Sequence, residues 1–465
     1  MKSLISFIDE GAEEKKEDKL RILIVSSSVL QDKLYHTASR FKDEGKKLGH
    51  DVYILQVENA YISYENNIHK IFNHEDKEGF ELNSTNTIAI VRGSVRLKKS
   101  WLDLLSRLEK IGIPMVNSRE TVEVSSDKYR SYLKLQDFGL TQPKTQLVPD
   151  GKLWKTAVEK LDSEFPIIMK TLEGSRGVGV LFVESERSLE SLIQLLYNQN
   201  EDVDLLIQEY IETDGDVRVI VLGDNIIGAM KREVVKGDFR SNVSQGAKAE
   251  EYSLTKLEVE QSLLAAKAVG GVYTAVDFIP SSEPKTKPPY ILEVNHSPGT
   301  TGIEKATGKN IVKEVIDYYS NPKNRYSIPS ECGHYETVSI EPFGNIIAKF
   351  DTGNSSLSVL HAEDIKVERK KVSWTLFGKR ITKPLVQTLS VRLGGLRDYE
   401  EERHTVKLDV KFAGTLYRNV EFTLDDRKNR TKILFNRNIM STMNVIVNPQ
   451  RKYVVTTKYD PQGEN

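Results

Sequence analysis

Apolar residues follow two alternating patterns over residues 20–117. Residues 20–25 form a nearly continuous apolar run, which is typical of a strand buried on both faces of a parallel sheet. Leu34, Ala38, Phe41 and Leu48 then recur at helical spacing. The next expected elements are strands over residues 51–57, 87–92 and 114–117, and a helix over residues 101–111. This alternation predicts an α/β domain with a mostly parallel sheet.

Residues 118–321 combine helices with strands that are antiparallel in character. Asp127 or a serine before it can cap a helix that Gly139 ends. Residues 216–222 and 225–233 are expected to form a hairpin around a turn that contains Gly223 and Asp224. The remaining expected helices are residues 152–161, 189–197 and 311–319, and the remaining strands are residues 145–148, 166–170, 205–210 and 274–277. The pattern predicts an α+β domain.

After residue 321 the pattern changes to short strands and turns. Residues 322–335 have few apolar side chains and two prolines, which is typical of a linker. The expected strands then cover residues 337–340, 345–350, 372–376, 385–393, 405–412, 415–424 and 432–435. Residues 336–465 are therefore predicted to form an all-β unit, a small barrel.

Composition narrows the class of protein. A chain of 465 residues is long enough for about three domains. The formal net charge of -1 gives no electrostatic reason to expect nucleic acid or an anionic membrane as a partner. The single cysteine, Cys332, excludes an intramolecular disulfide, and no Cys/His cluster suggests structural zinc.

The N-terminal residues 1–19 are expected to be a mobile charged tail. Their acidic and basic residues do not resemble a signal-peptide cleavage region. No apolar run in the chain approaches the roughly 18 residues of a membrane span. We therefore expect a cytoplasmic protein without a membrane partner.

The first candidate for chemistry is the loop between two apolar runs at residues 166–180. A strand ending in Lys170 is followed by Gly174, Gly177 and Gly179. Glycines let backbone N–H groups approach phosphate oxygens, and the lysine adds a positive charge. An ordinary glycine-rich hairpin has the same pattern, so the loop alone does not decide between the two.

A second candidate is the loop of residues 236–242, which contains Arg240, Ser241 and Asn242. The planar guanidinium of Arg240 can bind a carboxylate or a transferring phosphate through two parallel hydrogen bonds. A polar turn is the simpler interpretation of this segment taken alone.

A third candidate is an oxygen-rich set at strand ends. Asp277 ends one expected strand, and Glu293 and Asn295 lie two residues apart on another, so both project to the same side. Two carboxylates and an amide oxygen are the kind of ligands that Mg²⁺ prefers. Acidic residues at strand ends are usually just solvated. The phosphate-type loop upstream makes a metal site the better interpretation.

Several of these segments together resemble the RimK-type ATP-grasp carboxylate–amine ligases, which include enzymes that add glutamate to the C-terminus of a ribosomal protein. The resemblance covers roughly residues 20–321. It is densest at Glu173-Gly-Ser-Arg-Gly-Val-Gly179, Gln208-Glu-Tyr210, Gly237-Asp-Phe-Arg-Ser-Asn242, Glu293-Val-Asn-His-Ser-Pro-Gly299 and Gly302-Ile-Glu-Lys-Ala-Thr-Gly308.

The resemblance implies an ATP-grasp fold, ATP with Mg²⁺ or alternatively Mn²⁺, and roles for individual residues. Lys128 and Lys170 would contact the ATP phosphates under a lid that includes Glu173, Gly174, Gly177 and Gly179. Glu209 and Tyr210 would hold the adenine, and Asp216 the ribose. Asp277, Glu293 and Asn295 would bind the metal. Arg232, Arg240, Ser241 and Asn242 would line the γ-phosphate and acceptor site. The substrates implied are an amino acid and the carboxylate of a peptide, a protein C-terminus or another amino acid.

The C-terminal part contains one Asp-Thr-Gly, at Asp351-Thr-Gly353. Alone this tripeptide favours a simple turn, but with Leu424-Asp-Asp-Arg427 and Leu434-Phe-Asn-Arg437 it resembles retropepsin-like domains. Two such aspartates share a proton and activate water, so one copy per chain implies a homodimer or homotetramer. Asn354 and Asn436 stand where the family usually has small residues. The domain is therefore either an aspartic peptidase with Asp351 as its catalytic residue or an inactive dimerisation and substrate-docking module.

Overall fold

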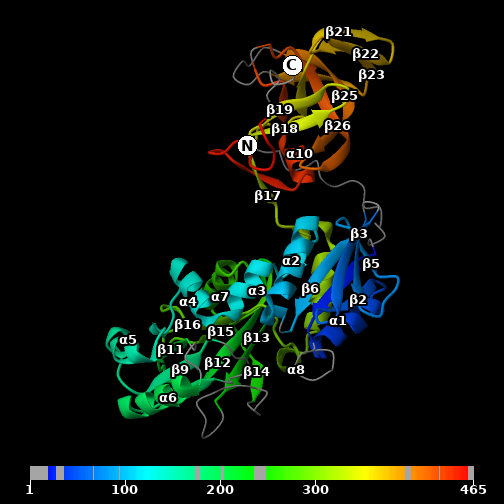
Figure 1. The fold of residues 1–465 in the computed structure, drawn as a ribbon. Helices are drawn as coiled ribbons and strands as arrows, with labels where there is room; N and C mark the ends of the chain where they lie inside the picture. Colours follow the sequence, from blue (N-terminus) through cyan, green and yellow to red (C-terminus); the bar gives the residue numbers. More distant parts are fainter. Residues whose placement is uncertain are drawn as a thin grey trace, which may run out of the picture. The chain divides into compact units, whose positions relative to one another are not determined.

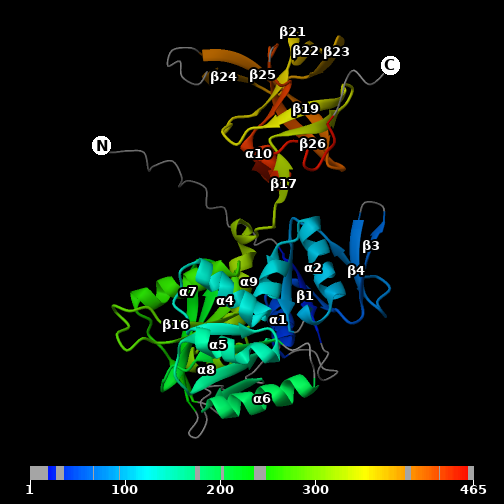
Figure 2. The same cartoon turned by 60° about the vertical axis from the view of Figure 1, so that its left-hand side comes forward.

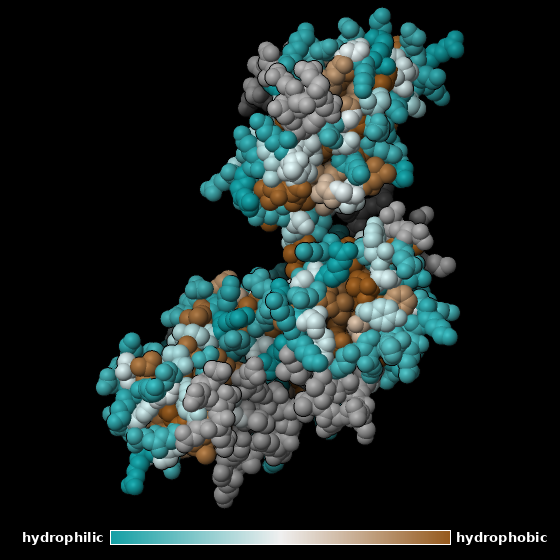
Figure 3. Space-filling view, in the orientation of Figure 1, coloured by the Kyte–Doolittle hydropathy of each residue, from teal (hydrophilic) through white to brown (hydrophobic). Residues whose placement is uncertain are grey.

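The computed structural model describes residues 19–27, 36–65, 68–93, 95–172, 179–199, 204–234, 248–392, 400–428 and 430–458. Contacts divide the chain into two compact units, Met1–Tyr326 and Ser327–Asn465 (Figure 1). Within the described ranges, every helix is too short or too polar to cross a membrane. Figure 3 shows one face of the molecule, on which hydrophilic side chains predominate and apolar ones form small separate patches.

A parallel sheet opens the first unit and confirms the predicted α/β class. β1 (Arg21–Ser26), β2 (Asp51–Gln56), β6 (Thr87–Arg92) and β7 (Met115–Val116) pair in the order β2-β1-β6-β7. Alternate residues of β1 point to opposite faces. Ile22 and Ile24 pack against α1 (His36–Lys47) and α9 (Ile311–Ser320), whereas Leu23 and Val25 pack against α2 (Lys99–Ile111) (Figure 2).

A small antiparallel sheet after β2 was not predicted. It consists of β3 (Ala60–Glu65), β4 (Ile68–Asn73) and β5 (Phe80–Leu82). Ile71, Phe80 and Leu82 are buried in the same core as Leu55 of β2. Its strands are short and mix polar with apolar positions, so they lack the continuous apolar runs by which the parallel strands could be recognised.

A second antiparallel sheet carries the strands on either side of the glycine loop. β8 (Thr145–Val148), β9 (Ile167–Thr171), β10 (Val180–Val183) and β11 (Leu205–Glu209) pair in the order β10-β9-β11-β8. Ile167 and Met169 pack with α5 (Trp154–Leu161) and α6 (Glu186–Gln199). Because side chains alternate along a strand, Ile168 and Lys170 face away from these helices.

The third antiparallel sheet is the largest sheet of this unit and has the order β14-β13-β12-β15-β16. Its strands are β12 (Gly215–Leu222), β13 (Asn225–Glu233), β14 (Ala249–Glu251), β15 (Tyr273–Ile279) and β16 (Tyr290–Asn295). β12 and β13 form the predicted hairpin. One face of the sheet packs on residues of α3 (Arg119–Ser126), α4 (Lys128–Asp137) and α7 (Lys256–Ala268).

The other face of this sheet is apolar at one end and charged at the other. Ile220, Leu222, Tyr273 and Ala275 share a core with β1 and α1. By alternation, Asp277 points to the same side as Tyr273 and Ala275. The apolar end thus fixes the sheet against β1 and α1 and leaves the charged end for a site.

Short helices and connections complete the first unit. The α4 helix begins after Asp127, whose carboxylate accepts from the backbone N–H groups of Tyr129 and Arg130, as expected for an N-cap. The remaining helical segments are α8 (Thr301–Thr307) and the 3₁₀ turns η1 (Val95–Leu97), η2 (Gly151–Leu153) and η4 (Pro322–Asn324).

The second unit is a closed β-barrel, which confirms the predicted all-β class. Its sheet has the order β18-β19-β27-β20-β26-β25-β24, and a further pairing of β18 with β25 closes it. The strands are β18 (Tyr335–Ile340), β19 (Gly344–Phe350), β20 (Ser358–His361), β24 (Thr388–Arg392), β25 (Glu400–Phe412), β26 (Thr415–Asp425) and β27 (Ile433–Phe435). Phe350, Phe422 and Phe435 pack together in its core.

Smaller elements surround the barrel. β21 (Glu363–Glu368), β22 (Lys371–Leu376) and β23 (Lys379–Pro384) form a three-stranded sheet, and α10 (Arg437–Thr442) follows β27. β17 (Ser330–Gly333) pairs with β28 (Val445–Asn448), so part of the segment expected to be a linker forms a strand of this unit.

Candidate active site

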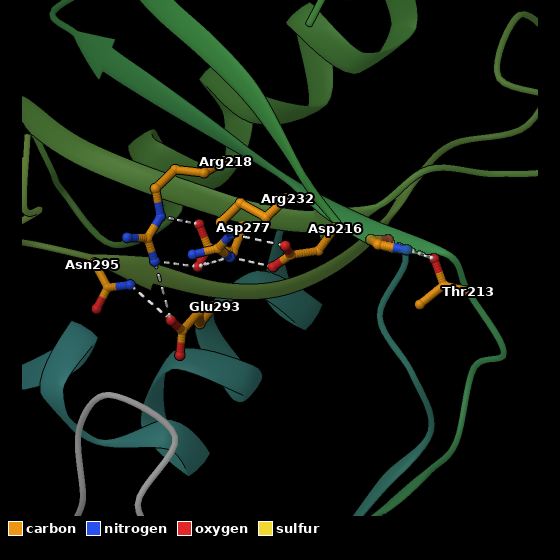
Figure 4. A network of polar contacts seen from close by, with 8 residues as sticks. Thr213, Asp216, Arg218, Arg232, Asp277, Glu293 and Asn295 are labelled. Carbon is orange, nitrogen blue, oxygen red and sulfur yellow. Dashed lines mark hydrogen bonds and ion pairs between the residues drawn. The ribbon is translucent and has the colours of Figure 1, made fainter. Parts of the chain in front are cut away.

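Strands β13, β12, β15 and β16 are neighbours in the largest antiparallel sheet, and they bring polar side chains together on one face. Arg218 of β12 lies directly opposite Asp277 of β15, which in turn lies opposite Glu293 of β16. On the other side of β12, Asp216 pairs in register with Arg232 of β13. Figure 4 shows these side chains pointing toward one another, with Asn295 beside Glu293.

Asp277 is at the centre of a buried ion-pair network. It is 2% exposed, and its carboxylate accepts from Arg218 Nε at 2.7 Å and from Arg232 Nη2 at 3.0 Å. Burial by itself would raise the pKa of Asp277, but the two guanidinium groups outweigh burial and hold the pKa well below its ordinary value. Asp277 is therefore ionised at neutral pH.

Arg232 joins the two buried carboxylates. Its Nε donates to Asp216 Oδ1 at 2.8 Å, and its Nη2 contacts both Asp216 and Asp277. Burial favours a lower pKa, but the two carboxylates outweigh it and raise the pKa of Arg232. The resemblance assigned Asp216 to ribose and Arg232 to the γ-phosphate site. Because each binds the other here, a substrate group at either residue would compete with this pair.

Glu293 and Asn295 form the more accessible part of the site. The Glu293 side chain is 48% exposed, and its Oε1 accepts from Asn295 Nδ2 at 2.8 Å. Arg218 Nη2 lies 3.9 Å from the same Oε1 while also binding Asp277. The two carboxylates thus already share one cationic group. Oxygen donors gathered around a positive charge fit the chemistry of a hard divalent cation.

Within the described ranges, no three or more His, Cys, Asp and Glu side chains gather closely enough to hold a metal ion. The predicted set differs from such a group because it contains two carboxylates and one amide. The set is suited to Mg²⁺ because its two carboxylates already lie around one positive group, the guanidinium of Arg218.

The predicted phosphate-binding lysines lie close together at the start of the glycine loop. Lys170 is half-buried, and its Nζ donates to Gln208 Oε1 at 2.7 Å. Lys128 Nζ donates to the carbonyl oxygens of Thr171 at 2.9 Å and Leu172 at 3.1 Å. Lys128 therefore holds the backbone that leads into the loop.

The pKa of Lys170 is lowered to about 8. Burial is the main cause, and the positive charge of Lys128 acts in the same direction, whereas Glu293 opposes both. Lys170 of β9 and Glu293 of β16, which belong to two different sheets, thus act on each other electrostatically. Positive groups on one side and negative groups on the other suit a triphosphate with a divalent cation.

Glu209 ends β11 opposite Ile167 of β9, and Tyr210 follows it. The backbone N–H of Glu209 donates to Lys144 O at 2.9 Å, and the Glu209 carboxylate accepts from the Lys144 N–H at 2.7 Å. The Tyr210 ring meets the Phe182 ring of β10 edge to face, with centroids 5.1 Å apart. These contacts fix the segment that the resemblance assigns to adenine.

The glycine loop itself lies mostly outside the described residues, including Glu173, Gly174 and Gly177. Gly179 is described and has a φ of 79°, and a Cβ placed there would lie 2.2 Å from Thr171 Oγ1. Only glycine fits this position without strain. Arg240, Ser241 and Asn242 of the second candidate loop and the tail of residues 1–18 also lie outside the described residues.

Arg218 was missed by the sequence analysis. It lies two residues after Asp216 on the same strand, so alternation alone places both on one face. That signal was present in the sequence. However, Asp277, the partner of Arg218, is distant along the chain, and the two residues could not be paired without knowledge of the strand register.

The segment after β16 is held in place by residues at the end of β6, a strand of the parallel sheet. The buried Arg92 at the end of β6 donates to Pro298 O, and its guanidinium lies over the rings of Phe41 and Tyr273 at 5.5 and 5.7 Å from their centroids. The N–H of Gly93 donates to Ser297 Oγ at 3.1 Å. The loop after Asn295 is therefore fixed from outside its own sheet.

Asn117 gives a second connection between the parallel sheet and the largest antiparallel sheet. Its Nδ2 donates to Tyr273 O at 2.7 Å and His296 O at 2.9 Å, and its Oδ1 accepts from the N–H groups of Val272 and Tyr273 at 2.8 and 2.9 Å. This buried amide thus joins the end of β7 to β15 and to the residue after Asn295.

The second unit places Asp351 at the end of β19. Its N–H donates to Phe435 O at 3.2 Å, and its Oδ1 accepts from the N–H of Gly353 at 3.0 Å. The two asparagines that depart from the family pattern have structural partners. Asn354 Oδ1 accepts from Ser356 N at 3.0 Å, and Asn436 Oδ1 accepts from Ser358 Oγ and Ile439 N, both at 3.1 Å.

Comparisons with known proteins identify two families in this chain. Residues 125–319 match the model of the RimK-like ATP-grasp domain, and residues 332–458 match that of the retropepsin-like aspartic endopeptidase RimB. A probable alpha-L-glutamate ligase of Pseudoalteromonas translucida is 33% identical over 289 residues, which are 62% of this chain and 91% of the relative. Another, from Methanococcoides burtonii, is 32% identical over 304 residues, 64% of this chain and 95% of the relative.

Among solved structures, the ATP-grasp ligase PsnB complexed with a phosphomimetic variant of its minimal precursor, Mg and ADP is 19% identical. It matches 63% of this chain and 96% of its own with a TM-score of 0.49. The assignment rests on the sequence relatives and the two family models, which confirm the resemblance. The chain belongs to the RimK-like ATP-grasp ligases, the family of these probable alpha-L-glutamate ligases, and carries a RimB-like retropepsin-like domain after the ligase part.

Proposed function

We propose that the first unit uses ATP and Mg²⁺ to join an amino acid to the carboxylate of a peptide, a protein C-terminus or another amino acid. One observation carries the proposal. Lys128 and Lys170 lie together at the start of the glycine loop, and the carboxylate of Glu293, which pairs in register with Asp277, acts on the charge of Lys170. Glutamate is the first candidate for the added amino acid, because the relatives are named probable alpha-L-glutamate ligases.

The reaction has two steps. An oxygen of the acceptor carboxylate forms a bond to the γ-phosphorus while the bond to ADP breaks, which gives an acyl phosphate. The amine nitrogen of the amino acid then attacks the acyl carbon, phosphate leaves, and the nitrogen loses a proton. Both steps build negative charge on oxygens, so fixed positive groups lower the barrier more than proton transfer does.

Each predicted residue has a proposed task in this reaction. Lys128 and Lys170 hold the phosphates, Glu209 and Tyr210 the adenine, and Asp216 the ribose. Asp277, Glu293 and Asn295 would hold Mg²⁺, with Mn²⁺ as an alternative, and that ion would neutralise charge on the phosphate oxygens. Arg240, with Arg232, Ser241 and Asn242 beside it, would receive the acceptor carboxylate and the γ-phosphate.

The test is ADP release by the full chain with a panel of amino acids and acceptor peptides. Glu293→Gln keeps the size of the side chain but removes its charge, and we expect at least a hundredfold loss of turnover, which is typical for removal of a key electrostatic contact. Glu283→Gln is the matched control, since Glu283 is exposed and its carboxylate pairs with nearby Lys287 and Thr286. Equal rates in Glu293→Gln and the control would refute the metal assignment.

For the second unit we propose an aspartic peptidase that works as a dimer or higher homo-oligomer, with one Asp351 from each copy. The family description of an aspartic endopeptidase and the single Asp-Thr-Gly per chain support this. Its substrate would be the material that the ligase extends. The alternative is an inactive dimerisation and docking module, which the asparagines at positions 354 and 436 favour.

Product analysis separates the two possibilities. A peptide extended by the wild-type ligase is incubated with wild type and with Asp351→Ala, and the products are identified by mass spectrometry. Cleavage that disappears in Asp351→Ala supports the peptidase. Identical products from both proteins would leave the docking module as the function of this unit.

A further inference from the structure

A small pocket in the second unit lies beside the loop that follows Asp351. Its volume is about 180 Å³, and Asn354, Ser356 and Leu357 of that loop form part of its lining. Pockets for whole small molecules usually measure about 300–1,000 Å³. This pocket is therefore of a size for a single side chain.

Three arginines also line the pocket, namely Arg403, Arg427 and Arg430. Arg403 and Arg427 are each only 8% exposed, whereas Arg430 is exposed. Buried guanidinium groups are costly unless they are paired, so their presence in one pocket needs an explanation.

The carboxylates around the pocket balance only part of this charge. Arg403 Nη2 lies 3.2 Å from both Asp425 Oδ2 and Glu401 Oε2. Arg427 Nε donates to the backbone oxygen of Thr431 at 2.8 Å, and no carboxylate of a described residue lies within ion-pair distance of its guanidinium. Three guanidinium groups thus face two carboxylates.

Two further observations indicate that the pocket has an excess of positive charge and of hydrogen-bond donors. Burial lowers the pKa of Arg427, and Arg430 and Arg403 lower it further, even though Asp425 and the more distant Asp351 act in the opposite direction. Among the described residues, the buried Nε of Arg403 has no hydrogen-bond partner. The pocket therefore offers donors and charge that an anion would satisfy.

Arg427 is also fixed in position before any ligand arrives. Its backbone N–H donates to Nδ1 of the buried His361 at 2.9 Å, and His361 Nε2 lies 3.2 Å from Glu363 Oε1. The side chain is held as well, because its Nε donates to Thr431 O, and a guanidinium held in this way loses less entropy on binding than one on a flexible chain.

We propose that this pocket binds the side-chain carboxylate of an acidic peptide. A guanidinium binds a carboxylate through two parallel hydrogen bonds, and the pocket has room for one such side chain. A peptide is the expected occupant because the pocket borders the Asp351 loop and the matched family is described as an endopeptidase. The site does not depend on the ligase reaction, and it holds whether or not Asp351 cleaves peptides.

The test uses a fluorescein-labelled tetraglutamate peptide, titrated with the full chain without ATP and followed by fluorescence anisotropy. Mass spectrometry checks that the peptide stays intact. Loss of a hydrogen-bonded ion pair corresponds to roughly a 10- to 100-fold weaker Kd, so we expect a loss in this range for Arg427→Gln. For the exposed Arg430→Gln, whose folding is not at risk, a loss of about threefold is expected.

Arg418→Gln is the control variant, because the Arg418 side chain is 71% exposed and pairs with Asp409 outside the pocket. It should bind tetraglutamate as tightly as the wild type does, whereas labelled tetraglutamine should bind wild type at least tenfold more weakly. Equal binding of the two peptides, or unchanged affinity in both Arg427→Gln and Arg430→Gln, would overturn the proposal.

A further arm distinguishes a peptide from a free anion. If millimolar inorganic phosphate displaces the peptide more strongly than unlabelled tetraglutamate does, the site is a phosphate site and the proposal fails. ADP release by the first unit is measured separately on the same preparations, so failure of the ligase proposal would be distinguishable from failure of this one.

Discussion

Replacing Asp277 by asparagine should destabilise the first unit far more than replacing Glu293 by glutamine. Asp277 is buried between Arg218 and Arg232, and asparagine keeps its shape but removes its charge. Removal of one partner from a buried ion pair costs about 3–5 kcal/mol. Arg232 keeps Asp216 as a second partner, so we expect a value near the lower end, about 3 kcal/mol.

Glu293 provides the comparison within the same site. Its side chain is 48% exposed and lies 3.9 Å from Arg218, which is the geometry of a surface ion pair. Such pairs contribute about 0–1 kcal/mol. Glu293→Gln should therefore unfold close to the wild type and yet lose ADP release, which would separate its chemical role from a structural one.

The assay is unfolding by urea, followed by circular dichroism and tryptophan fluorescence. Because the folded-state pKa of Asp277 lies below its unfolded value, its ionisation stabilises the protein above pH 4, and this contribution disappears as the pH falls through the folded-state pKa. The difference between wild type and Asp277→Asn should be constant from pH 5 to 8 and shrink in acid. An Asp277→Asn protein that unfolds at the wild-type urea concentration would refute the network as described.

Three further predictions concern other buried groups. Since the pKa of Lys170 is lowered to about 8, its ammonium loses its proton as the pH rises through that value, and the ATP affinity measured by calorimetry should fall between pH 7 and 9. Lys170→Met should abolish this fall, and an unchanged pH dependence would contradict it. Asn117→Ala removes the partner of four backbone groups, three of them in buried hydrogen bonds, and should cost about 3–6 kcal/mol in denaturant unfolding, compared with about 0.5 kcal/mol or less for the exposed Asn59→Ala. Glu336 is fully buried and accepts five hydrogen bonds, mostly from backbone N–H groups of residues 454–456. Glu336→Gln should therefore lower the stability of the second unit by about 2–4 kcal/mol, while a similar loss in the exposed control Glu331→Gln would count against that explanation.

The fold could be predicted wherever burial leaves a simple period in the sequence. The central strands β1 and β6 of the parallel sheet are buried on both faces and form continuous apolar runs, and α1 and α2 show the helical period. The antiparallel sheet β3-β4-β5 could not be predicted in this way. Only a few of its residues, such as Ile71 and Phe80, are buried, and the others alternate too briefly to distinguish a strand from a loop.

The candidate site could be predicted in part because strand ends collect polar side chains. Asp277, Glu293 and Asn295 were recognisable from their places in two expected strands, and the structure brings them together. The sequence did not show which acidic and basic side chains form ion pairs with one another. Arg218 and Asp277 are neighbours only because β12 pairs with β15, and no local pattern reports that pairing.

Even the hairpin of β12 and β13 shows why residue counting is not enough. Counting back from Leu222, which pairs with Asn225, would place Asp216 opposite Lys231. A bulge between Ile220 and Val221 shifts the register by one residue and places Arg232 there instead. A shift of one residue moves every following side chain to the other face of the sheet. The bulge therefore determines whether the guanidinium of Arg232 lies on the same face as the buried carboxylate of Asp216. The pair that holds the site together therefore depends on a backbone irregularity that the pattern of polar and apolar residues does not show.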